Sequence, residues 1–475
     1  MSQHFIPIDR DSPMLLPVDL RDWLPESHLV HFVIEAVEGL PLTGFKVNHR
    51  GTGDAQYPPG MMLSLLIYCY ATGRFSSREI EAASHFDVAV RYICGGNTHP
   101  DHDTICTFRR ENGKAFELAF VHVLGMAREL GVLKKTGGVS VDGTKVNANA
   151  SKHAAVSYKR AGEMIAELEK EVQLLMVEAE RSDKQGNRST VDLPAEIARR
   201  KQRREQLAHA RKIIEGRFAE RREEKQAEYD EKQARRDAAR AAGKKPRGVE
   251  PACPASTPED KEQVNFTDEE SRIMKVGNGG QFEQAYNAQA AVDIEGSMLV
   301  LGQRVTDRVN DKAQLEPTVA AIDPTIRQVT AVLADTGYYA DSAIQKVTQS
   351  TSATCYVATG KQPHHRSVEA VLNPLAEPPP LLPGATPAEV MSHLLATPAG
   401  KAIYSLRKQT VEPVFGIIKQ AMGFRQFLLR GLENVSLEWT LVTLAYNVRR
   451  IFRLKPKHKN DEKQVLGKVP FGAVC

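Results

Sequence analysis

Apolar residues recur at helical spacing through the first part of the chain. Two segments, 18–40 and 58–73, show this spacing. Ser76 and Glu79 form the capping-box pattern Ser-x-x-Glu, which opens an amphipathic helix that we expect to run toward Ile93. The first part of the chain is therefore predicted to form a helical module.

The end of this module has the pattern of a DNA-binding helix pair. After the turn GGNTHP, Asp103 is expected to cap a helix that ends in Arg109 and Arg110. A helix, a turn and a second helix with a basic end can form a helix-turn-helix reader, in which the second helix contacts base edges. Many helix pairs joined by a turn touch no DNA, so both interpretations stay open.

From Gly138 the pattern changes to the alternation of a β-strand. In VSVDGTKV, Val139 and Val141 alternate with Ser140 and Asp142. A long stretch rich in Ala, Glu, Arg, Lys and Gln follows, with two helical segments separated by the turn formers SDKQGNRSTVD. This stretch predicts a long antiparallel helical hairpin. Its charge runs, such as ARRKQRRE, are typical of a solvated helix face and could also touch DNA phosphates.

Strands and helices then alternate to the end of the chain. The expected order is a strand pair in FEQAYNAQAAVD and MLVLGQRVT, a helix over 311–322, strands in QVTAVLAD and TCYVAT, a helical region from about Ala399, and a last helix over 434–452 before a basic tail. Without the hairpin, this succession is close to that of an RNase H-like fold, in which the first and fourth strands lie side by side.

We therefore predict an α/β fold with an RNase H-like core, in which a mixed five-stranded sheet has flanking helices. A long helical hairpin interrupts this core, and an all-α domain precedes it. The predicted divisions are a helical DNA-binding-type domain over 1–135, the first part of the core over 136–151, the hairpin and its linker over 152–262, the rest of the core over 263–433, and a C-terminal helix with a basic tail over 434–475.

Composition narrows the possible partners only slightly. The chain has 475 residues, of which 41% are hydrophobic, and this excludes a chain that is disordered throughout. With 63 Lys and Arg against 59 Asp and Glu, the formal net charge is only +4. A polyanionic partner would therefore have to be held by local basic patches rather than by overall charge.

The cysteines and apolar segments indicate the compartment. The six cysteines are scattered and form no CxxC pair, which argues against a zinc ribbon and against a disulfide framework. The longest apolar stretch, 61–70, is far shorter than the roughly 20 residues that cross a bilayer, and the N-terminal sequence has no signal-peptide pattern. We expect a soluble cytoplasmic protein without a membrane partner.

Three acidic residues stand at places where this fold would use them. Asp142 ends or follows the first strand, Asp335 ends the fourth, and Glu412 lies in a late helix. A charge at the end of an apolar strand is costly unless it binds a cation or a hydrogen-bond donor. Hard oxygen ligands select Mg²⁺ or Mn²⁺, and two such ions about 4 Å apart would activate a water or a 3′-hydroxyl. Taken singly, each Asp could equally be a turn residue and Glu412 a surface residue.

The sequence around these acids resembles the DDE transposases of bacterial insertion sequences. The matching pieces are YPPGMMLSLLIYCYATGRFSSREIE, HPDHDTICTFRREN, VDGTKVNANASK, NFTDEESRIMK, YNAQAAVD, LADTGYYAD and YSLRKQTVEPVFGIIKQAMGFRQFLLRG. The resemblance implies that Asp142, Asp335 and Glu412 are catalytic and bind two Mg²⁺ or Mn²⁺ ions. It also implies DNA cleavage and strand transfer at insertion-sequence ends, terminal inverted repeats and target DNA as partners, a homodimer on DNA, and a place at the bacterial nucleoid.

The region of Glu412 also resembles the Tyr-x2-Arg-x3-Glu-x6-Lys signature of many such transposases. Tyr404 and Arg407 fit, and Lys419 fits, but four residues rather than three separate Arg407 from Glu412. Lys408 has the expected spacing and lies one helical turn before Glu412, so we favour it over Arg407 for a phosphate contact. Pro413 disfavours α geometry at Glu412 and predicts a kink. The candidate DNA-binding residues are Tyr404, Arg407, Lys408, Lys419, Arg425, Arg430, Arg109 and Arg110.

Two other functions fit parts of the sequence. The motif VSVDGT resembles the nucleophile motif of haloacid-dehalogenase-type phosphatases, but Ser140 takes the place of the nucleophilic Asp, and the spacing from Asp335 to Asp341 is too wide for the later acidic pair. The second alternative is a catalytically inactive, transposase-derived DNA-binding or coiled-coil assembly protein. The presence of all three acids counts against it.

Overall fold

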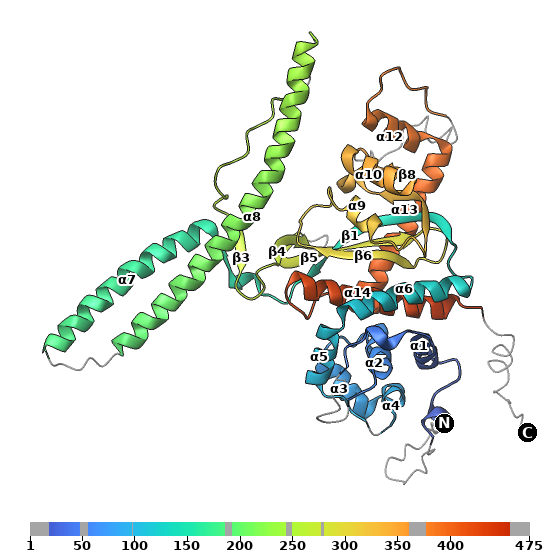
Figure 1. Cartoon of the computed structure of the whole chain (residues 1–475), viewed down its shortest axis with the longest axis horizontal. Coiled ribbons are helices and arrows are strands. Elements are labelled where there is room, and N and C mark those ends of the chain that lie inside the picture. The colour runs from blue at the N-terminus through green and yellow to red at the C-terminus, as the bar shows by residue number, and fades with distance from the viewer. Residues whose placement is uncertain are drawn as a thin grey trace, which may run out of the picture.

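A helical module forms the first part of the chain and is drawn in blue in Figure 1. The computed structural model describes residues 19–47, 56–96, 98–185, 192–243, 249–276, 280–360 and 377–456. The elements of the module are η1 (Leu20–Trp23), α1 (Leu29–Glu38), η2 (Leu42–Gly44), α2 (Pro59–Ala71), α3 (Ser77–Phe86), α4 (Val88–Cys94), α5 (His102–Glu111) and α6 (Gly113–Glu129).

The helix expected from the Ser76 capping box to Ile93 is divided in two. The capping box is present, with the Glu79 carboxylate accepting a hydrogen bond from the Ser76 amide. Asp87 accepts hydrogen bonds from two amides of the next turn and starts the separate helix α4. A single capping side chain therefore splits an otherwise continuous helical pattern.

The helix α5 begins slightly earlier than its sequence suggests. Asp101, and not Asp103, is its N-cap, because the Asp101 carboxylate accepts a hydrogen bond of 2.7 Å from the Thr104 amide. The predicted N-cap at Asp103 was wrong by one half-turn, since both residues have the right chemistry and the helix uses the first of them.

A mixed sheet of six strands follows the module. Its strands are β1 (Thr136–Asn147), β4 (Arg272–Val276), β5 (Gln281–Asp293), β6 (Val300–Thr306), β7 (Gln328–Ala334) and β8 (Thr354–Val357). The central strand β1 pairs antiparallel with β5 and parallel with β7, and β8 extends the sheet beyond β7. On its other edge β5 pairs with β4 along its first part and with β6 along the rest.

This arrangement confirms the predicted α/β class and RNase H-like core. The first and fourth core strands, β1 and β7, are adjacent as expected. The prediction of five strands was wrong by one, because β4 pairs with the exposed edge of the long strand β5. The helix expected over 311–322 is also shorter, and α9 covers Leu315–Ala320.

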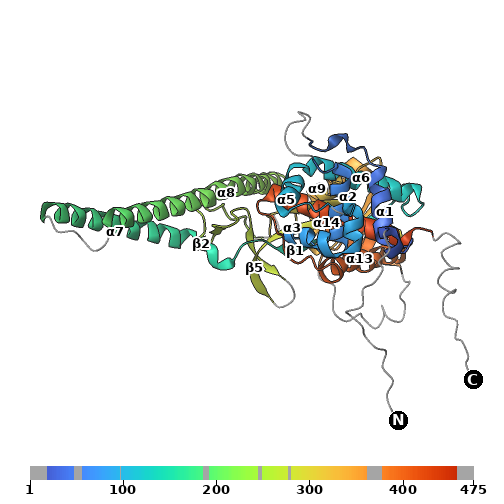
Figure 2. The same ribbon diagram turned by 90° about the horizontal axis from the view of Figure 1, so that it is seen from below.

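The hairpin leaves the sheet after β1 and projects far from the rest of the molecule (Figures 1 and 2). It begins with η3 (Lys152–Ala154), and the short strands β2 (Ala155–Ser157) and β3 (Gln263–Asn265) pair across its base. Its two helices are α7 (Tyr158–Gln185) and α8 (Leu193–Ala241). Apolar residues at the base form a small core of their own, composed of Val156, Ala161, Leu207, Ala210, Ile214 and Val264.

The last helix joins the sheet to the helical module, and it lies between them in Figure 1. The helical elements that follow β6 in the chain are α9, η4 (Thr336–Tyr338), α10 (Asp341–Thr351), α12 (Pro387–Ala396), α13 (Pro398–Gly416), the π-helical turn η5 (Ile417–Ala421) and α14 (Leu432–Leu454). In α14, Trp439 donates a hydrogen bond to the Gln289 carbonyl in β5, and Arg449 donates one to the Ala71 carbonyl in α2. The module and the sheet therefore share one hydrophobic core.

Within the described residues, no helix combines the length and the apolarity that spanning a bilayer requires.

Candidate active site

The pairing of β1 with β7 brings two of the three predicted acids together. Ser140 lies opposite Leu333 in this parallel ladder. Asp142 and Asp335 each follow two residues later along the two chains, and the charge of Asp335 acts on Asp142. Asp142 accepts a hydrogen bond of 2.8 Å from the Gly143 amide, and Asp335 accepts one of 2.8 Å from the Gly337 amide.

The third acid, Glu412, is linked to Asp142 by an arginine of α13 that contacts both carboxylates. Arg407 lies 3.3 Å from the Asp142 carboxylate and 3.1 Å from the Glu412 carboxylate, one nitrogen of its guanidinium to each. The Arg407 side chain is only 13% exposed, so these contacts are made largely out of water. The sheet and α13 thus present their carboxylates to a single cation of the protein.

The electrostatics of Asp142 show how much this site depends on positive charge. Burial raises the pKa of Asp142 to about 7, Arg407 opposes this rise, and the neighbouring carboxylate of Asp335 adds to it. A carboxyl group with such a pKa is poorly compensated by its surroundings and gains from any further cation. Arg407 and the Gly143 amide favour its charged form, and Lys145 also interacts with this charge.

Asp311 is a carboxylate near this site that the sequence analysis missed. It lies in the turn before α9, and its Oδ1 accepts hydrogen bonds from Asn287 at 2.7 Å and from Gln289 at 2.8 Å. Its charge also raises the pKa of Asp142. The available signal was the pair of polar residues Asn287 and Gln289 inside an apolar strand, because buried amides require hydrogen-bonding partners.

Two lysines bring further positive charge to the same region. Lys145 on β1 lies 3.6 Å from Asp311, and burial lowers its pKa while nearby carboxylates oppose this shift. Lys419 in the π-helical turn donates a hydrogen bond of 2.7 Å to the backbone carbonyl of Lys145. Burial lowers the pKa of Lys419 as well, and the charge of Lys145 adds to this effect.

The three carboxylates are chemically suited to bind a hard divalent cation, but they are not arranged as a ready metal site. Carboxylate oxygens are the ligands that Mg²⁺ and Mn²⁺ prefer, and the buried charge of Asp142 calls for a cation. In the part of the chain that the structure describes, however, no three His, Cys, Asp or Glu side chains are grouped as a ready metal site. Arg407 joins Asp142 and Glu412 instead, and acts as their counter-cation here.

Arg407, and not Lys408, lies against the acids, while the phosphate contact expected of Lys408 stays a prediction. Lys408, favoured for the role facing the acids, is exposed on α13, whereas Arg407 contacts both Asp142 and Glu412. The helix α13 continues through Pro413, and a π-helical turn begins at Ile417. The long side chain of Arg407 reaches Glu412 five residues later, whereas the prediction considered only residues three or four positions apart on the helix.

The remaining candidate DNA contacts of this region lie at different distances from the acids along the chain. Tyr404 is half-buried and donates a hydrogen bond of 3.3 Å to the Ala334 carbonyl, next to Asp335. Arg425 and Arg430 are exposed, and Arg430 donates a hydrogen bond of 3.0 Å to the Asn149 carbonyl just beyond β1. These side chains could meet a phosphate backbone without disturbing the core.

The two arginines of the helical module differ in their surroundings. Arg109 is 3% exposed, and its guanidinium donates hydrogen bonds to the Tyr70 hydroxyl at 2.8 Å and the Phe75 carbonyl at 3.0 Å. A side chain held this way inside the module cannot read base edges, so the expectation for Arg109 was wrong. Arg110 is exposed and remains a candidate for DNA contact.

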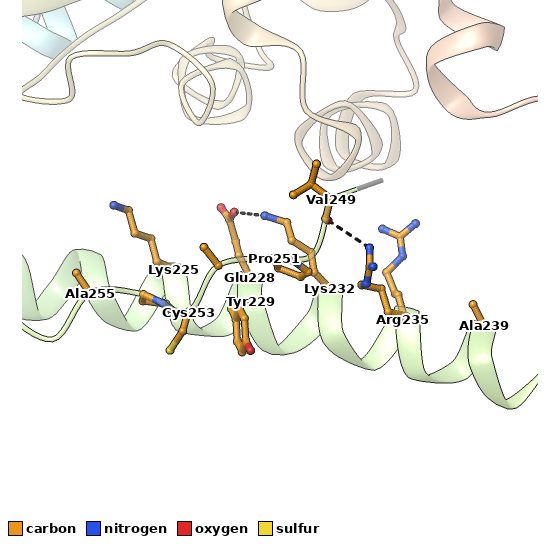
Figure 3. Close-up of a pocket in the computed structure, with 13 residues that line it drawn as sticks. Lys225, Glu228, Tyr229, Lys232, Arg235, Ala239, Val249, Pro251, Cys253 and Ala255 are labelled. Carbon is orange, nitrogen blue, oxygen red and sulfur yellow. Dashed lines mark hydrogen bonds and ion pairs between the residues drawn. The ribbon is translucent and has the colours of Figure 1, made fainter. Parts of the chain in front are cut away.

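A cavity of about 710 Å³ lies away from the acids, between the outer half of α8 and the returning segment 249–255 (Figure 3). Its charged lining residues are Lys225, Glu228, Lys232, Arg235 and Arg236. Glu228 pairs with Lys232 at 3.0 Å, as the figure shows. The cavity therefore has no pair of carboxylates for acid–base or metal chemistry, and its basic lining suits an anionic surface.

Two family models match the chain. Residues 18–111 match a model described as Transposase domain (DUF772), and residues 256–448 match one described as Transposase DDE domain. The second match contains Asp335 and Glu412, while Asp142 precedes it on β1, which pairs with two matched strands. Comparison with the curated proteins and with the solved structures yields no match. The two transposase domains, in this order and on an RNase H-like core, show that the chain belongs to the DDE transposases of the insertion-sequence type.

Proposed function

We propose that this transposase cleaves the phosphodiester backbone at the ends of an insertion sequence and joins the freed 3′-hydroxyl to target DNA. The observation that carries the proposal is the position of Asp142 and Asp335 on adjacent parallel strands, with Glu412 linked to Asp142 through Arg407. The carboxylates come from three separate elements, since Asp142 lies on the central strand β1, Asp335 follows the adjacent strand β7, and Glu412 lies on α13. Their arrangement suits phosphoryl transfer that depends on divalent cations.

Asp142, Asp335 and Glu412 are the residues that would hold the metal, two ions of Mg²⁺ or Mn²⁺. When bound, such ions supply an activated water or 3′-hydroxyl and stabilise the leaving oxygen of the phosphodiester. The protein's own part is to bring the three carboxylates together and to shield Asp142 from water. Burial that raises the pKa of Asp142 also strengthens its attraction for a cation.

Arg407 is suited to exchange partners during this reaction. Its planar guanidinium binds carboxylate and phosphate with the same geometry. In the DNA-free protein it neutralises Asp142 and Glu412. Once these carboxylates have other cations, Arg407 becomes free to hold a phosphate of the strand being cut. We assign the other candidate residues of α13 and the segment after it to the backbone of the same DNA, namely Tyr404, Lys408, Lys419, Arg425 and Arg430.

The partners in this proposal are the terminal inverted repeats and the target DNA, bound by a homodimer. We place the protein in the bacterial cytoplasm, at the nucleoid when it is bound to DNA. A transposition reaction has to hold two DNA ends, and a symmetric pair of subunits provides one active site for each end.

The test uses the purified full-length chain and a labelled duplex that carries the inverted repeat flanking this reading frame. With Mg²⁺ or Mn²⁺ we expect cleavage that leaves a 3′-hydroxyl, followed by a product in which this end is joined to a second DNA. A protein that binds the duplex but yields neither product in either metal would instead be the inactive, transposase-derived DNA-binding protein.

A further inference from the structure

A cluster of buried polar residues lies against the residues that follow Asp142. Gly143 and Lys145 follow Asp142 along β1. Their partners on β5 are Gln289 and Asn287, both fully buried. Two buried amide side chains in the middle of a sheet cost free energy unless their donors and acceptors are satisfied.

Asp311 satisfies both amides at once. The same oxygen of its carboxylate accepts a hydrogen bond from Asn287 at 2.7 Å and from Gln289 at 2.8 Å. Gln289 also donates to the side-chain oxygen of Asn287 at 2.9 Å, and the ammonium of Lys145 lies 3.6 Å from Asp311. Asp311 is therefore the common acceptor for the side chains of Asn287 and Gln289 and the ion-pair partner of Lys145.

The cluster reaches Asp335 through a tyrosine. Tyr338 is fully buried, and its hydroxyl donates a hydrogen bond to the side-chain oxygen of Gln289. It lies in η4, the turn whose N-cap is Asp335. A hydrogen-bonded path thus runs from Asp311 through Gln289 and Tyr338 to the turn that begins with Asp335.

The cluster also leaves no room beside Asp142. A Cβ atom placed on Gly143 would lie 2.3 Å from the Gln289 amide nitrogen and 2.9 Å from the Asp311 carboxylate. Both distances are shorter than real carbon atoms allow, so residue 143 has to be glycine while the cluster is intact. The backbone that carries Asp142 is held against the same group of side chains as the backbone that carries Asp335.

We infer that Asp311 is a positioning residue, which fixes the place of Asp335 relative to Asp142 through Gln289 and Tyr338. The inference rests on the proposed function for its effect on cleavage, but the positioning itself is a property of the protein without DNA. In catalysis, a displacement of about 1 Å at a reacting group can cost about 100-fold in rate.

The first experiment needs no DNA and measures backbone hydrogen exchange of the full chain by mass spectrometry. In Asp311→Ala and in Tyr338→Phe, we expect peptides that cover 336–339 to exchange at least about fivefold faster, because a buried hydrogen bond is lost. Asp311→Asn keeps an oxygen that can accept both amide hydrogens, and it should exchange as the wild type does. Unchanged exchange in Asp311→Ala, or equal acceleration in Asp311→Asn, would overturn the inference.

The second experiment measures the single-turnover rate of end cleavage at saturating duplex. Asp311→Ala should cleave about 100-fold more slowly than the wild type, while the DNA concentration that gives the half-maximal rate stays unchanged. Asp311→Asn should cleave at least about tenfold faster than Asp311→Ala. Asn447→Ala is the matched control, because Asn447 is also fully buried and hydrogen-bonds the backbone of Val300, far along α14. It should lower thermal stability without slowing cleavage by the folded protein.

The outcomes separate this inference from the proposed function. If the wild type cleaves and Asp311→Ala cleaves equally fast, or if Asn447→Ala slows cleavage as much as Asp311→Ala does, the positioning role is wrong while the proposed function stands. If the wild type does not cleave the duplex at all, the proposed function fails, and hydrogen exchange alone still decides whether Asp311 holds the Asp335 turn.

Discussion

Replacement of Asp142 by asparagine should stabilise the metal-free protein at alkaline pH. Burial raises the pKa of this carboxyl group from 3.8 to about 7, and the charge of Asp335 adds to the rise. A folded-state pKa above the unfolded-state value means that the folded protein holds a proton over this interval which the unfolded chain releases. The stability is therefore highest at low pH and falls as the pH rises toward 7.

The size of this effect follows from the pKa shift. One pKa unit corresponds to about 1.4 kcal/mol, so between pH 5 and pH 8 the ionisation of Asp142 should lower the free energy of unfolding by about 3 kcal/mol. Above about pH 8, where Asp142 is ionised in both the folded and the unfolded state, its contribution should be constant. Asp142→Asn keeps the shape of the side chain and removes the ionisation, so the free energy of unfolding of this variant should lack this decrease.

The assay is urea unfolding of the wild type and Asp142→Asn in EDTA at pH 5 and at pH 8. The difference in free energy of unfolding between variant and wild type should grow by about 3 kcal/mol in favour of the variant. Asp341→Asn, which changes an exposed carboxylate in the same domain, is the control and should track the wild type. Parallel pH profiles for Asp142→Asn and wild type would refute the reasoning, since Asp142 would then not titrate near neutral pH in the folded protein.

Three further predictions follow from the charged residues. Arg407→Ala should lower the free energy of unfolding at pH 8 by about 2 kcal/mol in urea denaturation, because the buried charge of Asp142 loses its counter-cation, whereas Lys408→Ala should change it by less than about 0.5 kcal/mol. Lys419→Ala and Arg430→Ala should each flatten the salt dependence of end-DNA binding by about 0.9 in the logarithmic slope, and an unchanged slope in a titration would place them away from the phosphates. Arg109→Ala should destabilise the folded protein by about 3 kcal/mol in thermal unfolding, through the lost contacts to Tyr70 and Phe75, whereas Arg110→Ala should weaken DNA binding without this loss.

The strand pattern was sufficient to predict the neighbouring position of the two aspartates. Asp335 follows β7 as expected, whereas Asp142 lies inside β1, which continues to Asn147, and an RNase H-like order of elements brings the first and fourth strands together. This inference needed only the alternation of apolar residues and the order of the elements. Both are properties of short segments that the sequence displays directly.

The parts that sequence reasoning missed depend on tertiary contacts. Asp311 was expected to begin a helix but lies in the turn before α9, and only the folded sheet shows that it accepts hydrogen bonds from Asn287 and Gln289. Arg407 was ranked below Lys408 because helical spacing considers neighbours on one helix, whereas Arg407 is held by Asp142 on another element. The burial of Arg109 likewise depends on how α5 packs against its neighbours.

The most direct test of the account compares single-turnover cleavage of the end duplex in Mg²⁺ by the wild type with that of Asp142→Asn, Asp335→Asn and Glu412→Gln. Each variant should bind the duplex with wild-type affinity and cleave it at least about 1,000-fold more slowly, because a neutral amide cannot hold the divalent cations. Asp341→Asn should cleave at the wild-type rate. Native cleavage by any one of the three acid variants would contradict the assignment of that residue to the active site, and native cleavage by Asp142→Asn and Asp335→Asn together would overturn the site.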